Sequence, residues 1–187
     1  VFMGVVIAMI GAWGMFPYAS EIKGITFWGL VILEFAVLFA FMYTKHFLTY
    51  ISFTFLTGVT LVPILAHYVS VGASGAIVQA LIGTSIITGG LTYYASTTTK
   101  NYLGMGTTLF WVLIALVVMM VANIFIGSSM LATGVSMIAV ILFSFFIIYD
   151  TQTVINGMVE PLDAAMSIYL DILNLFVHLL HLLGMDD

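Results

Sequence analysis

Charged residues are scarce in this sequence. They make up 6% of its 187 residues, whereas a typical soluble domain carries about 25%. The basic residues are three lysines with no arginine, which is too little positive charge to neutralise a row of nucleic-acid phosphates. Cysteine is absent, which excludes disulfide frameworks and thiolate metal sites. These absences exclude a soluble domain, a disordered chain and a nucleic-acid-binding protein.

Most residues of the chain are apolar. The hydrophobic fraction is 63% and the mean hydropathy is +1.26. Because a membrane-spanning helix needs about 20 mainly apolar residues, the sequence predicts an all-α integral membrane protein. It is expected to form a single domain over residues 1–187, a bundle in which consecutive spans are antiparallel neighbours. The seven predicted spans cover residues 1–19, 25–44, 47–69, 76–94, 103–125, 131–155 and 162–184.

Small residues and the few loop charges add two further predictions. Glycines that are candidates for close helix contacts are Gly83, Gly89, Gly90, Gly104 and Gly106. Lys45 and Lys100 fall on one side of the membrane, and Lys23, offset by Glu21, falls on the other. The excess of positive charge on cytoplasmic loops then predicts a cytoplasmic N-terminus.

Three carboxylates fall inside predicted spans, namely Glu34, Asp150 and Asp171. An ionised group near the bilayer centre costs at least a few kcal/mol, so such groups are usually paired, neutralised or functional. Asp150 lies roughly 10 Å before the last turn and Asp171 roughly 15 Å after it at helical rise. The two side chains are therefore expected to meet and to share one proton. The alternative is a buried pair that only pins two helices together.

Other polar groups extend this pattern. Asp171, Asn174, His178 and His181 lie on one face of the last span, a face expected to turn toward the bundle interior or water. Glu34, Asn174 and His178 are the pore-lining candidates. For both histidines, the alternative is that they only reach the membrane surface.

Lys45 follows Glu34 by three helical turns and lies at the same end of the bundle as Asp150. It is a candidate partner that pairs with the carboxylates in one state only. Alternatively, its side chain extends along the helix to the aqueous interface.

Two segments resemble a known family. Residues 58–65, Gly-Val-Thr-Leu-Val-Pro-Ile-Leu, match the motif G-x-[ST]-L-x-P-x-L, and residues 167–176 read Ser-Ile-Tyr-Leu-Asp-Ile-Leu-Asn-Leu-Phe. Both are similar to the transmembrane Bax-inhibitor-motif family, and within it to the bacterial YetJ-type pH-sensitive calcium leak channels. The resemblance implies a seven-helix bundle with the seventh helix surrounded by the other six. It also implies a pH-sensing pair at Asp150 and Asp171, which a basic residue at Lys45 contacts in one state.

The leading hypothesis is therefore a calcium leak channel or transporter, gated by protonation of the aspartate pair, in a prokaryotic inner membrane. Carboxylate oxygens suit a hard cation, and Asp150 and Asp171, with Asn174 and water, are expected to bind calcium weakly. Calcium would be the permeant ion, with protons and the lipid bilayer as the other partners and no tightly bound cofactor or enzymatic activity.

Two alternatives stay open. One is a non-transporting regulator of another membrane protein, such as a membrane protease. The other is a zinc-dependent membrane hydrolase that uses histidine and aspartate ligands. A catalytic zinc needs about three protein ligands, and His46 and His67 lie at opposite ends of one span, so both cannot join His178 and His181.

The role proposed for Lys45 gives a first prediction. Lys45→Ala removes a competing partner of the aspartate pair, so it is expected to shift the pH midpoint of ion flux in liposomes or of a conformational change. A pH profile identical to that of the wild type would show that Lys45 only reaches the membrane surface.

Overall fold

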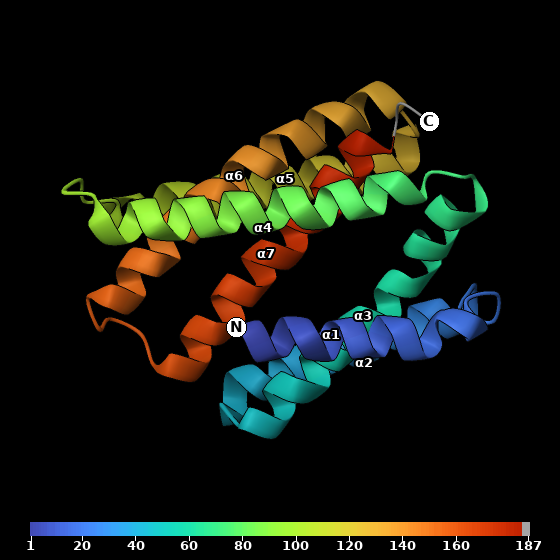
Figure 1. Cartoon of the computed structure of the whole chain (residues 1–187), viewed down its shortest axis with the longest axis horizontal. Coiled ribbons are helices and arrows are strands. Elements are labelled where there is room, and N and C mark those ends of the chain that lie inside the picture. The colour runs from blue at the N-terminus through green and yellow to red at the C-terminus, as the bar shows by residue number, and fades with distance from the viewer. Residues whose placement is uncertain (185–187) are drawn as a thin grey trace. The chain divides into compact units, whose positions relative to one another are not determined.

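The computed structural model describes residues 1–184, and the regular secondary structure in this part of the chain is helix joined by short turns (Figure 1). Its seven α-helices confirm the predicted all-α class. They are α1 (Phe2–Met15), α2 (Ile25–Thr44), α3 (Phe47–Ser70), α4 (Ser74–Thr97), α5 (Gly106–Ile126), α6 (Ser129–Ile155) and α7 (Pro161–Leu183), with short 3-10 helices η1 (Phe16–Tyr18) and η2 (Leu103–Met105). The chain forms two compact units, Val1–Ser74 and Gly75–Asp187.

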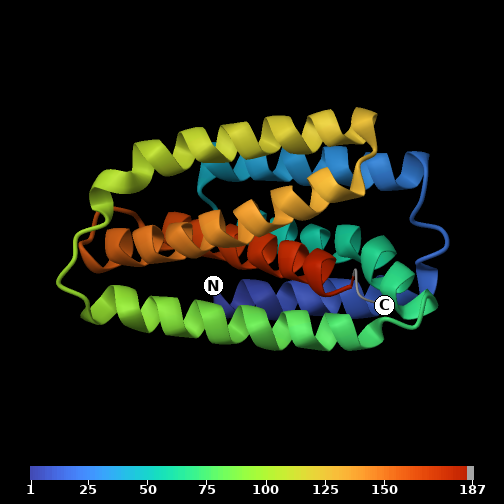
Figure 2. The same ribbon diagram turned by 90° about the horizontal axis from the view of Figure 1, so that it is seen from above.

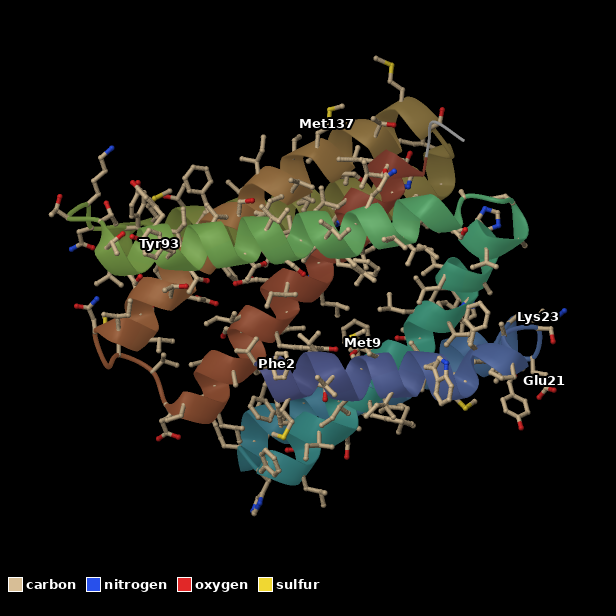
Figure 3. The ribbon with its side chains drawn as sticks, viewed as in Figure 1. Phe2, Met9, Glu21, Lys23, Tyr93 and Met137 are labelled. Atoms are coloured by element: carbon tan, nitrogen blue, oxygen red, sulfur yellow. The ribbon has the colours of Figure 1, made fainter. Side chains whose placement is uncertain are left out.

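Six of the described helices, α2 to α7, are long and apolar enough to cross a membrane. The first is shorter, and with η1 it runs over Phe2–Tyr18. Large apolar side chains such as Met9, Tyr93 and Met137 are exposed (Figure 3), as expected for helices that face lipid. The charges of Glu21 and Lys23 lie at the turn between α1 and α2 (Figure 3). The chain is a multi-pass membrane protein.

In the first unit, α3 packs against both α1 and α2. The predicted pairing of consecutive spans is therefore wrong for α1, whose main partner is α3. Glycine allows this close approach: a Cβ atom at Gly11 would lie 2.6 Å from the Phe55 carbonyl oxygen, and one at Gly58 would overlap the Ala8 carbonyl group. Small residues let helix backbones approach each other in membranes, where packing rather than water drives association.

The second unit is built around α6 and α7, which pack side by side (Figure 2). The α5 helix packs against α6. Its apolar core comprises Leu109, Leu116, Val135, Ala139, Leu142, Phe143, Ile147 and Leu175, and Ile87 and Leu91 of α4 pack against it. This core fixes α6 beside α7 and so sets which of their polar side chains meet.

The glycines chosen from the sequence mostly do not mark close contacts. A Cβ atom at Gly89, Gly90 or Gly104 would have no described atom within 4 Å. One at Gly83 would make an ordinary 3.7 Å contact with Leu179. Of the five predicted positions, Gly106 alone is tight, because its Cβ atom would lie 2.7 Å from the Tyr149 hydroxyl oxygen.

The α1–α3 crossing gives a prediction about stability. Gly58→Ala forces two backbones apart and is expected to lower the unfolding free energy by about 1–3 kcal/mol. Gly29→Ala, within α2 of the same unit and with no described atom within 4 Å, is the matched control. It should raise stability by up to about 1 kcal/mol through helix propensity. Thermal unfolding in detergent, followed by circular dichroism, measures both, and a Gly58→Ala protein as stable as the wild type would contradict the assignment.

Candidate functional site

The α6 and α7 helices bring Asp150 and Asp171 together. The turn between them, residues 156–160, is short, so the helices leave it as neighbours. The two carboxyl groups share a side-chain hydrogen bond, which confirms the predicted meeting. Asp171 is 5% exposed, and Asp150 is partly buried.

This hydrogen bond depends on the protonation state of the two carboxyl groups. An ionised carboxylate has acceptor oxygens only, so two carboxyl groups can hydrogen-bond to each other only when at least one of them holds a proton. No N–H or hydroxyl group of residues 1–184 donates to the buried Oδ2 atom of Asp171. A hydrogen bond between the two groups therefore requires at least one proton on the pair, and the sharing of a single proton stays a prediction.

The polar face of α7 continues from Asp171 toward the end of the helix. The Asn174 amide donates to the Leu170 carbonyl oxygen at 2.7 Å. The His178 Nδ1 atom lies 3.2 Å from the Ser136 hydroxyl oxygen, and its ring stacks on Phe143 with centroids 6.3 Å apart. His178 is 6% exposed, so the alternative that it only reaches the membrane surface is wrong for this residue.

His181, one turn further along α7, is partly buried. No described group hydrogen bonds to its buried Nε2 atom. Together with Asp171, Asn174 and His178 it forms a continuous polar face along almost three turns of α7, a helix that packs against α6. The predicted inward orientation of this face is thus confirmed at Asp171 and His178, the two residues that are almost fully buried.

Glu34 has a partner that the sequence did not suggest. The Thr60 hydroxyl donates to the Glu34 Oε2 atom at 2.7 Å. Thr60 is the hydroxyl position of the Gly-x-Thr-Leu-x-Pro segment in α3, so this motif supports a carboxyl group on α2. The bond lies in the first unit, whereas the aspartate pair lies in the second, and a pore-lining role for Glu34 stays a prediction.

Lys45 ends α2 in the left-handed backbone conformation, with φ +50°. Its N–H donates to the Phe41 carbonyl oxygen at 2.7 Å, and His46 then leads into α3. Lys45 also lies in the first unit, so its pairing with the aspartates stays a prediction. Asparagine tolerates this left-handed backbone conformation better than alanine does. Lys45→Asn is therefore the control for Lys45→Ala, because it removes the charge with less backbone strain.

The described residues contain no group of three histidine, aspartate or glutamate side chains placed to hold a metal ion. The zinc-hydrolase alternative therefore finds no ligand set in residues 1–184. Calcium binding at Asp150 and Asp171 stays a prediction. A proton between the two carboxyl groups and a calcium ion would compete for the same oxygens, because a cation requires the ionised form.

Comparison with known proteins identifies a family that the chain matches. The whole chain, residues 1–187, matches the family described as inhibitor of apoptosis-promoting Bax1. An uncharacterized Campylobacter jejuni protein is 40% identical over 94% of this chain and 80% of its own length. An uncharacterized membrane protein of Vibrio cholerae is 38% identical over 71% of this chain and 60% of its own length. The modulator of FtsH protease YccA of Escherichia coli is 32% identical over 76% of this chain and 71% of its own length.

The predicted sharing of one proton can be tested with three variants. Asp150→Asn and Asp171→Asn each leave one carboxyl group without a carboxyl partner, so each should abolish the infrared signal of a carboxylic acid hydrogen-bonded to a carboxylate and flatten its pH dependence. The double variant should be little worse than the more damaging single one, since the two residues act as a unit. Glu34→Gln is the control, because it also removes a membrane carboxyl group but lies outside the pair. A normal pH response in either single Asp variant would place the sensor elsewhere.

Proposed function

The chain belongs to the Bax inhibitor-1 family, and from this premise we propose that it regulates another membrane protein, a membrane-bound protease of the FtsH kind. The observation that carries this proposal is the similarity to the Escherichia coli modulator of FtsH protease, which extends over 76% of this chain.

The composition of the chain suits such a role. Its connections between helices are short, and its helices expose many large apolar side chains. A contact with a partner would therefore form laterally, helix against helix within the bilayer, where packing of side chains supplies the attraction. The aspartate pair would act in this proposal as the internal group whose protonation changes how α6 and α7 pack.

Co-reconstitution tests the regulatory role. Proteoliposomes that hold an FtsH-type protease and a membrane substrate are compared with and without the purified protein. The protein is expected to change the rate of substrate degradation at least twofold, and an unrelated multi-pass protein at equal density controls for competition as a second substrate. Equal rates in both preparations across protein-to-protease ratios would reject the regulatory role.

A second function is favoured by one specific feature, the hydrogen-bonded carboxyl pair in two membrane-crossing helices. Ionisable groups inside membrane spans often mark ion or proton pathways. We therefore also propose a calcium leak that responds to pH: loss of the shared proton frees the carboxylate oxygens for the cation.

Flux into protein-only liposomes decides this second function. Liposomes loaded with a calcium indicator and carrying the wild-type protein should take up calcium faster than empty liposomes. Asp171→Asn should reduce this uptake most, because Asp171 is the more deeply buried member of the pair. Glu160→Gln, at an exposed carboxyl group in the turn before α7, serves as the control. Uptake equal to that of empty liposomes at every pH would reject the leak and leave the regulatory role untouched.

A further inference from the structure

Gln152, near the end of α6, attaches that helix to the segment between α4 and α5. Its Oε1 atom accepts a hydrogen bond from the Tyr102 backbone N–H at 2.8 Å. Its Nε2 atom donates to the Lys100 carbonyl oxygen, also at 2.8 Å. The side chain is 6% exposed, so both bonds are shielded from competing water. Gln152 thus holds two backbone groups of one short segment at once.

The same segment is held at a second point. Gly106, the first residue of α5 directly after this segment, lies against Tyr149, since a Cβ atom there would lie 2.7 Å from the hydroxyl oxygen and 2.8 Å from the ring carbon that bears it. Glycine is therefore needed for the ring to pack there. The 3-10 helix η2, which lies between the two attachment points, also contacts α6.

Asp150 lies between the two attachment residues in sequence but points elsewhere. At 100° per residue, Tyr149 and Gln152 project about 60° apart, whereas Asp150 projects at least 100° from either. Asp150 instead meets Asp171 of α7. The last turns of α6 are consequently held on two sides, by residues 100–106 on one and by α7 on the other.

We propose that Gln152 is a positioning residue for the aspartate pair: its two bonds to Lys100 and Tyr102 hold the end of α6 so that Asp150 stays within hydrogen-bonding reach of Asp171. Without these bonds, Gln152 no longer ties α6 to the segment, and two neighbouring carboxyl groups repel each other whenever both ionise. The inference concerns the geometry of the pair, and it stands whether the protein regulates a protease or passes calcium.

The test uses Gln152→Met, which keeps the length of the side chain and removes both bonds. The chain has one other glutamine, Gln79, which is exposed on α4, so Gln79→Met is the matched control. Two readouts on purified protein in detergent are compared: hydrogen exchange of the Tyr102 backbone amide, and the infrared signal of the shared carboxyl proton. Gln152→Met should speed the exchange at least tenfold and abolish or shift the infrared signal, as Asp150→Asn does.

Two results would overturn the proposal. Faster exchange at Tyr102 with an unchanged carboxyl signal would mean that Gln152 orders the segment only. An unchanged rate of hydrogen exchange at the Tyr102 amide would mean that the two bonds of Gln152 do not hold the segment in place. Gln152→Glu provides a second variant if Gln152→Met does not fold: it keeps the acceptor for Tyr102, loses the donor for Lys100, and should give a smaller change in both readouts than a complete loss.

Discussion

The contact between two carboxyl groups on neighbouring helices is the interaction on which the second unit depends. Asp150 and Asp171 come from adjacent helices of a membrane-spanning chain, and their direct hydrogen bond exists only while at least one of them is protonated. With the proton present, the pair joins α6 to α7. Without it, two negative charges face each other in a site with little water, and the same two helices are pushed apart. A single proton therefore changes the sign of the interaction between the two helices.

The remaining contacts of that unit determine how a change in this pair is transmitted. On α7, His178 contacts Ser136 and Phe143 of α6. These contacts join the two helices at a second place, in addition to the aspartate pair. Behind α6, the bonds of Gln152 reach the segment that leads into α5. The α6 helix consequently cannot move away from α7 without straining contacts on its other side. In the first unit, by contrast, the close crossing of α1 and α3 rests on glycine and apolar packing.

Sequence reasoning predicted the parts of this structure that depend on local pattern. Hydropathy located the helices, and the meeting of Asp150 with Asp171 followed from two carboxylates at similar distances from one short turn. It failed where the result depends on how helices rotate and cross. Four of the five glycines predicted to make close helix contacts do not make them, whereas Gly11 and Gly58 do. Whether a glycine lies at a close contact depends on which helix packs beside it, and the sequence does not give that neighbour. Thr60, Ser136 and Gln152 were missed for the same reason, since each bonds to a residue at least 26 positions away.

The depth of the aspartate pair has an electrical consequence. Asp150 lies five residues before the end of a membrane-crossing helix, so part of the membrane potential falls between the pair and the aqueous phase. A proton that enters or leaves the pair moves through that part of the field, and a full elementary charge crossing 100 mV exchanges about 2.3 kcal/mol with it. If the pair binds and releases a proton as predicted, the fraction of protein with an occupied pair would depend on membrane voltage as well as on pH. In an energised cell, depolarisation alone would change how α6 and α7 pack.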